Sequence, residues 1–296
     1  EPLNIKASFG FKAKVPKEHR LLNPSLGGGS ILDIGCYPMS FSRMVVGTQE
    51  GKYFLNPISI LVKGKLSDEG IDLFSFADEL AVASNVDSKE YLLSLIGKDR
   101  HIDVSKEQAK YGNYGETLDK FPLDSARLKN VVERVSAMAN WQDFKAGKLP
   151  KGHALGIAVH RSFVSYVACV VQVSKSAQGK VKLEKIFMSV DCGTAVNPER
   201  IKSQMEGAAV FGISLAFYGE VTAKEGVIEQ GNFDDYPIAR ITDVPPTDVD
   251  IVMSDAPPGG VGEPGVPPVA PAICNAIFAA TGKRYRELPL NQYNIL

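Results

Sequence analysis

The chain has 296 residues, with 33 Lys and Arg against 34 Asp and Glu and a formal net charge of −1 at pH 7. Hydrophobic residues make up 44% and charged residues 23%, which is typical of a globular protein that buries a core. The balanced charge favours neither nucleic acid nor an anionic membrane surface as a partner. The sequence contains no run of about eighteen apolar residues, so it predicts no membrane-spanning helix. The length allows one large domain or two of ordinary size.

In chain order, the first elements predict a small α+β unit. Residues 3–13 predict a strand, residues 27–47 a helix that begins after three glycines, and residues 58–66 a second strand. From about residue 74 the pattern changes to two short helices. After a polar stretch, residues 124–141 predict an amphipathic helix with an apolar face.

The second half alternates strands and helices. Residues 153–175 predict a β-rich run with a turn near 161–165, followed by a return strand over 180–193. Asn197 is a candidate N-cap with Pro198 at the first helical position. A strand over 247–255 precedes the last helix, so the fold class predicted for the whole chain is α+β.

The loop before the last helix, residues 256–271, contains four Gly and six Pro. Its one ionisable side chain is Glu263. Gly262 and Gly265 let the backbone pass close to a bulky group, and Pro264 restricts Glu263 to extended conformations. The pattern indicates either an ordinary connection with an exposed Glu or a rigid frame around a functional carboxylate.

The first part of the chain resembles the C-terminal domain of the Gfo/Idh/MocA family of nicotinamide-dependent sugar and alcohol dehydrogenases. The resemblance is carried by ASFGF (7–11), HRLLNPSLGGGSILDIGCYPMSFSRMVVG (19–47) and ISILVKGKL (58–66). It implies that residues 1–75 are a fragment of such a domain, in which Asp33 and Tyr37 match residues that bind and protonate substrate. No GxGxxG follows a strand and the family's partner Lys is missing, so Asp33 and Tyr37 are interpreted as vestigial and NAD(P) is not expected to bind.

Residues 76–290 resemble the C-terminal part of the molybdopterin-binding large subunit of the xanthine dehydrogenase/aldehyde oxidase family, in its isoquinoline 1-oxidoreductase β-subunit form, and residues 76–296 are assigned to this domain. Four blocks follow in the family's order: HALGIAVHRSFVSYVACVVQVS, VDCGTAVNPERIKSQMEGAAVFGIS, GNFDDYPIAR and SDAPPGGVGEPGVPPVAPAICNAIFAATGKR. The resemblance implies a mixed α/β molybdopterin-binding domain. It also implies an oxidoreductase that hydroxylates an aldehyde or N-heterocycle carbon with oxygen derived from water.

The same resemblance assigns roles to individual residues. Glu263 matches the general base of the family, and Gly262 and Gly265 match positions where the backbone approaches the cofactor. Gln204, on the helix that begins after Asn197, is either a cofactor contact or a polar residue of the helix surface. Ser162 and Phe163 lie where the family has a loop near the active site and are assigned cofactor contacts. The four Cys and four His show no metal-ligand spacing, so no metal site made by the chain itself is predicted, and the cysteines are interpreted as buried apolar residues.

Most segments that hold the cofactor in this family come earlier in the subunit, so the cofactor cage here is incomplete. A separate 2Fe–2S small subunit and a small-molecule substrate are the partners that the resemblance implies. The two resemblances meet near residue 75, which predicts a chimera of two families. The alternatives are a dehydrogenase fragment of the Gfo/Idh/MocA kind and a truncated fusion without activity. The localisation stays open, with the cytoplasm favoured over the periplasm.

Overall fold

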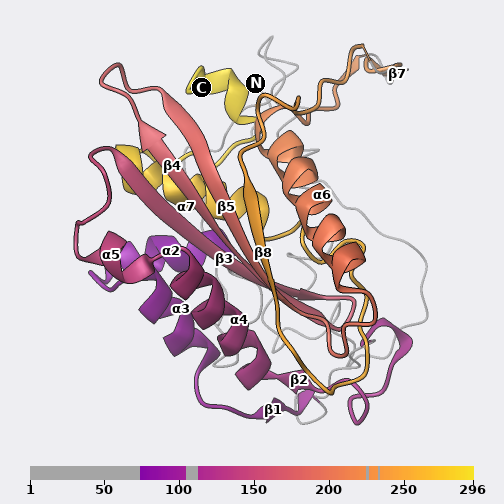
Figure 1. Cartoon of the computed structure of the whole chain (residues 1–296). Coiled ribbons are helices and arrows are strands. Elements are labelled where there is room, and N and C mark those ends of the chain that lie inside the picture. The colour runs from indigo at the N-terminus through magenta and orange to yellow at the C-terminus, as the bar shows by residue number, and fades with distance from the viewer. Residues whose placement is uncertain (1–73, 105–112, 225–226, 233) are drawn as a thin grey trace, which may run out of the picture. The chain divides into compact units, whose positions relative to one another are not determined.

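The computed structural model describes residues 74–104, 113–224, 227–232 and 234–296 (Figure 1). The chain divides into two compact units, and the second, residues 71–102 and 113–296, contains the elements described below. Asp33 and Tyr37 lie outside the described residues. The Gfo/Idh/MocA resemblance, the boundary at residue 75 and the chimera therefore stay predictions.

A four-stranded sheet forms the centre of the second unit, with strand order β3-β4-β5-β8. Its strands are β3 (His153–Ser162), β4 (Ser165–Lys175), β5 (Val181–Asp191) and β8 (Thr247–Ile251). The first three pair antiparallel, and β8 pairs parallel to β5. β4 is a nearly continuous apolar run because it is buried on both faces, so it lacks the alternation of a strand with one wet face.

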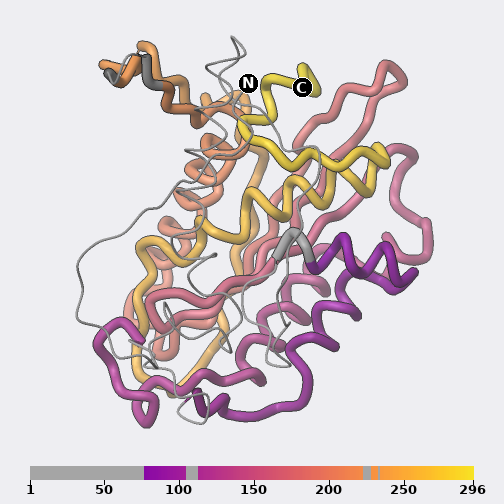
Figure 2. The backbone as a smooth tube through the Cα atoms, turned by 180° about the vertical axis from the view of Figure 1, so that it is seen from behind, coloured from indigo at the N-terminus to yellow at the C-terminus, as the bar shows by residue number. Residues whose placement is uncertain are grey.

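Helices cover both faces of this sheet. One face packs on α6 (Pro198–Phe217) and α7 (Val269–Thr281), and the other packs on α3 (Ser88–Ile96) and α4 (Ser125–Met138). Figure 2 shows α7 running along the sheet. The mixed α/β architecture agrees with the fold predicted for this part of the chain.

Asp and Asn side chains cap three of these helices, and the cap predicted at Asn197 is confirmed. Asp87 accepts from the backbone N–H of Glu90 before α3, and Asn197 accepts from Arg200 N before α6. Asp124 caps α4 through the N–H groups of Ala126 and Arg127. The helix predicted over 124–141 ends at Met138, because Asn140 adopts a left-handed conformation (φ 52°) that breaks it.

Smaller elements complete the described unit. They are α2 (Phe74–Ala83), α5 (Trp141–Lys145), the pair β1 (His101–Ile102) and β2 (Leu123–Asp124), the pair β6 (Ala223–Lys224) and β7 (Val227–Ile228), and the 3-10 turns η4 (Asn113–Gly115) and η5 (Leu290–Tyr293). None of the helices in the described ranges is long and apolar enough to cross a membrane.

The three cysteines in the described residues are poorly accessible. Cys169 and Cys192 are buried and Cys274 is partly buried, and burial raises the pKa of each thiol, that of Cys274 to about 11. Because the thiolate is the reactive form, we expect Cys274 in the native chain to react with iodoacetamide at pH 8 about 100-fold more slowly than after unfolding. Mass spectrometry of time points checks this rate, and rapid native labelling of Cys274 would contradict the burial described here.

Candidate functional site

The Gly- and Pro-rich loop crosses one end of the central sheet and ends at the start of α7. Three main-chain hydrogen bonds fasten it to strand ends: Thr194 N to Ala256 O at 2.8 Å, Gly259 N to Cys192 O at 2.7 Å, and Gly260 N to Phe163 O at 2.8 Å. In addition, the Ser165 hydroxyl donates to the carbonyl of Gly260 at 2.7 Å. The loop is therefore attached both to the β3–β4 turn and to the end of β5. We call residues 256–268 the base loop.

Close packing explains several glycines of the base loop. A Cβ at Gly259 would lie 2.4 Å from Ser165 Oγ, and one at Gly265 would lie 2.7 Å from the Cβ of Ala208 on α6. Gly265 is thus buried against α6 and packs inside the domain. Gly262 is different: it is exposed, and a Cβ there would meet only the Gln204 amide nitrogen, at 3.6 Å.

The fold brings five of the predicted residues to this end of the sheet. Ser162 and Phe163 lie at the β3–β4 turn, Gln204 lies on α6, and Gly262 and Glu263 lie in the base loop. The turn and the loop are joined by the bond from Gly260 to Phe163, and the helix and the loop meet where Gln204 adjoins Gly262. These residues are distant in sequence, so their convergence is a product of the fold.

Glu263 has a fixed backbone and an unengaged side chain. Its carbonyl accepts from Val266 N at 2.9 Å, and the following Pro264 and Gly265 are buried. Its carboxylate is exposed and makes no hydrogen bond or ion pair within the described part of the chain. The N–H of Val269, at the start of α7, donates to Val266 O. This N–H group is therefore already paired and is not available to bind an anion. The shield from water that a general base needs is not supplied by the described domain.

Ser162 is a buried polar residue without a partner. It is 5% exposed, and among the described residues its hydroxyl makes no hydrogen bond. Leaving a buried hydroxyl unpaired is costly, so such a group is expected to bind water or another bound molecule. Phe163 and Val164 beside it have φ of 50° and 58°, the left-handed values that a two-residue hairpin turn requires. For a β-branched residue such as Val164 this conformation is strained.

An aromatic pair lies at the same turn. The Phe163 and Tyr114 rings stack with centroids 4.8 Å apart and an interplanar angle of 27°, and both are exposed. Tyr114 is a site residue that the sequence does not reveal, since it lies in a polar stretch without periodicity. Only the folded chain places it beside Phe163.

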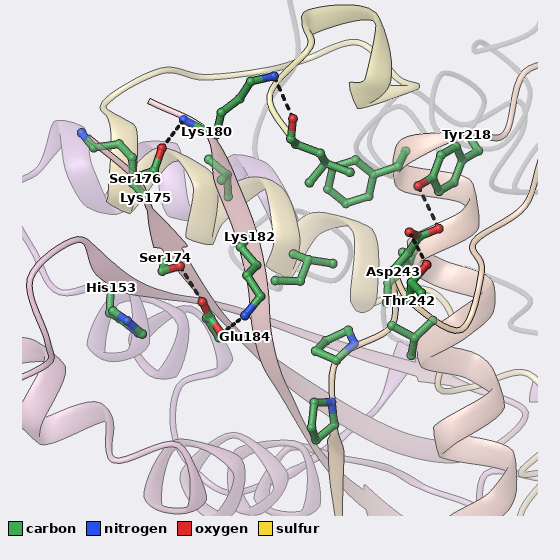
Figure 3. A pocket seen from close by; sticks show the side chains of 18 of the residues that line it. His153, Ser174, Lys175, Ser176, Lys180, Lys182, Glu184, Tyr218, Thr242 and Asp243 are labelled. Atoms are coloured by element: carbon green, nitrogen blue, oxygen red, sulfur yellow. Dashed lines mark hydrogen bonds and ion pairs between the residues drawn. The ribbon is translucent and has the colours of Figure 1, made fainter. Parts of the chain in front are cut away.

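A separate cavity of about 800 Å³ lies at the other end of the sheet, near the β4–β5 hairpin (Figure 3). Figure 3 shows Glu184 between Ser174 and Lys182, which bind it at 2.6 Å and 2.9 Å. The Ser174 hydrogen bond and then Lys182 hold the pKa of Glu184 below its usual value. Because β4 alone extends about 30 Å, this cavity is far from the base loop, and it contains none of the predicted site residues. Its acidic Glu184 is already engaged by Ser174 and Lys182, so the base loop is the stronger candidate site.

The described domain contains no group of three or more His, Cys, Asp or Glu side chains that could hold a metal ion. What the geometry defines instead is an α/β domain with a carboxylate on a rigid loop, flanked by an amide and a buried hydroxyl. Such an arrangement offers hydrogen bonds to a bound molecule.

Comparison with known proteins identifies the class. Residues 95–245 match the family model of the molybdopterin cofactor-binding domain, and the chain belongs to this family. It is 34% identical over 229 residues to the membrane-bound aldehyde dehydrogenase [pyrroloquinoline-quinone] of Gluconacetobacter polyoxogenes, covering 75% of this chain and 27% of that protein. It is also 34% identical over 167 residues to the β-subunit of isoquinoline 1-oxidoreductase from Brevundimonas diminuta, covering 56% and 21%.

Two further proteins are similar to parts of this chain. A nicotinate dehydrogenase subunit of Pseudomonas putida is 29% identical over 222 residues, covering 73% of this chain and 17% of that protein. Among solved structures, the quinoline 2-oxidoreductase of Pseudomonas putida 86 has a TM-score of 0.40 and 20% identity over 44% of this chain and 18% of its own. The chain thus spans about a quarter or less of the length of these curated relatives.

Proposed function

We propose that the chain forms part of the large subunit of a molybdenum hydroxylase that oxidises an aldehyde or an N-heterocycle, with Glu263 as the general base. The observation that carries this proposal is the base loop itself. Its backbone is fastened at both sides, while its single carboxylate points into solvent without a partner in the described domain. A general base needs such a fixed position and an unoccupied carboxylate to accept a proton.

The residues beside the loop fit a molybdopterin cofactor. The unpaired Ser162 hydroxyl and the Gln204 amide offer hydrogen bonds to it, and Gly262 leaves room beside Gln204. When bound, the cofactor would supply the oxygen transfer and take up the two electrons. Glu263 would accept the proton from the hydroxyl that attacks the substrate carbon. The exposed faces of Phe163 and Tyr114 suit a planar substrate next to the loop.

The exposed face of α6 supports a larger assembly. Val210, Phe211 and Leu215 are all exposed on this helix, and Phe211 is 58% exposed. Apolar groups gathered on one surface commonly mark a contact with further protein. We propose that the remainder of a large subunit covers this face and shields Glu263 from water. A 2Fe–2S small subunit that drains the electrons, and a cytoplasmic location, belong to the same proposal.

Metal analysis tests the proposed function. We expect the isolated 296-residue chain to retain neither molybdenum nor nicotinamide cofactor, since the described domain supplies only one side of a cofactor site. We expect the protein purified at its native length from its source to contain stoichiometric molybdenum by plasma mass spectrometry. Native-length protein without molybdenum would overturn the proposal. Pyrroloquinoline quinone in its place would favour the chemistry named for the Gluconacetobacter relative.

A further inference from the structure

A buried ion pair joins α4 to the end of β5, next to the residues that hold the base loop. Arg127, in the first turn of α4, donates from Nε to Asp191 Oδ2 at 2.9 Å and from Nη2 to Asp191 Oδ1 at 2.6 Å. The two side chains are only 13% and 3% exposed. Burial opposes the charge on Arg127, but the hydrogen bonds and charge of Asp191 outweigh it and raise its pKa above the ordinary value. The two hydrogen bonds hold the pair in one two-pronged geometry.

Asp191 is followed directly in the chain by the residues that hold the base loop, 192–194. Its Oδ1 also accepts from the N–H of Gly193 at 3.1 Å. A Cβ at Gly193 would lie 2.2 Å from Pro257 O, so this residue touches the loop directly. On either side of Gly193, Cys192 accepts from Gly259 N and Thr194 donates to Ala256 O. The carboxylate that Arg127 holds thus orients the strand end on which the loop is anchored.

Arg127 also contacts Tyr166, the residue next to the second anchor of the loop. Its guanidinium lies over the Tyr166 ring, 4.8 Å from the centroid, and Tyr166 pairs with Asp191 across β4 and β5. The Tyr166 hydroxyl accepts from Asp124 N at 2.8 Å and donates to Pro122 O at 2.9 Å, which fixes the ring. The next residue back along the chain is Ser165, whose hydroxyl binds Gly260 O. One side chain therefore supports both attachment points of the loop.

We propose that Arg127 is a positioning residue for Glu263, acting through Asp191 and Tyr166. The catalytic part of this inference rests on the proposed function of Glu263, whereas the anchoring of the loop does not. Removing one partner of a buried pair leaves an uncompensated charge, so the remaining carboxylate would move toward water and take the strand end with it. A displacement of about 1 Å in a catalytic group can cost about 100-fold in rate.

The same helix offers a matched control. Arg134 makes an equivalent two-pronged pair with Asp250, at 2.6 Å and 2.5 Å, but it is 43% exposed and does not contact the base loop. The variants to compare are Arg127→Met, Arg127→Lys and Arg134→Met. The lysine variant keeps the positive charge and loses only the two-pronged hydrogen bonding of the guanidinium. It therefore tests the proposal even where the methionine variant fails to fold.

Hydrogen–deuterium exchange of the full chain is the first readout. In Arg127→Lys we expect the amides of Thr194, Gly259 and Gly260 to exchange about 10-fold faster, because these N–H groups make the loop attachments. The amides at the β4–β5 hairpin should be unchanged, and Arg134→Met should leave the loop amides as they are. Loop amides that stay fully protected in both Arg127 variants would overturn the anchoring.

Turnover of the native-length enzyme is the second readout. Arg127→Lys should lower kcat by about 10- to 100-fold with KM and molybdenum content within about twofold of the parent, whereas Arg134→Met should keep kcat within about twofold. If Glu263→Gln abolishes turnover but Arg127→Lys does not lower it, the positioning role is overturned. If Glu263→Gln itself leaves turnover intact, the function proposed for Glu263 has failed, and the exchange result still decides whether Arg127 anchors the loop.

Discussion

Glu263→Gln in the native-length enzyme is expected to lower kcat by about 10²- to 10⁴-fold, the contribution typical of a general base. Glutamine keeps the size and shape of the side chain but removes its negative charge and its capacity to take up a proton. Because the carboxylate is exposed and has no partner in the described domain, the change should leave folding and molybdenum content unaltered. Steady-state kinetics measures kcat, and metal analysis of the same preparation measures the molybdenum content.

A matched carboxylate makes this result specific. Glu220, just beyond the end of α6, is also exposed and lies outside the base loop. Glu220→Gln removes the same charge from the domain and should leave kcat within about twofold, as expected for a surface change away from the site. Near-normal turnover in Glu263→Gln would exclude Glu263 as the base. Equal losses in the two variants would point to net charge rather than to a proton acceptor.

Local chemistry made much of this fold predictable. Asn197 caps α6 as predicted, because a cap depends on residues within one turn of it. The apolar run over β3 and β4 could be assigned to strands because its residues are β-branched and its turn is short. The loop around Glu263 was conspicuous for its Gly and Pro content alone.

What the sequence could not supply are contacts between distant residues. Arg127 and Asp191 are 64 positions apart, and no pattern in either segment indicates that they pair. Tyr114 and Phe163 lie in separate segments, before β2 and after β3, and come together only in the folded chain. Likewise, the need for glycine at Gly265 arises from Ala208 on α6, which the loop sequence does not reveal. The Gly and Pro pattern thus predicted where the base loop lies, whereas tertiary packing determines which residues hold it in place.

Gly156→Ala is expected to destabilise the full chain by about 3 kcal/mol or more, the upper range for overpacking a core. Gly156 lies on β3, where a Cβ would stand 2.1 Å from Ala276 N and 2.3 Å from Ala272 O. These atoms belong to the backbone of α7, so no side-chain rotation can relieve the contact and the whole helix must move. Urea unfolding followed by the fluorescence of the single, buried Trp141 measures the loss.

Gly207→Ala is the opposite case on α6, since a Cβ there meets nothing within 4 Å. Alanine should stabilise the isolated chain by about 1 kcal/mol, the usual difference between the two residues inside a helix. Equal unfolding midpoints for the two variants would mean that α7 can shift away from β3.

The contact at Gly156 bears on the site as well, because α7 begins where the base loop ends. A helix displaced by Gly156→Ala would pull on Pro264 and Gly265, so Glu263 keeps its position only while α7 stays against the sheet.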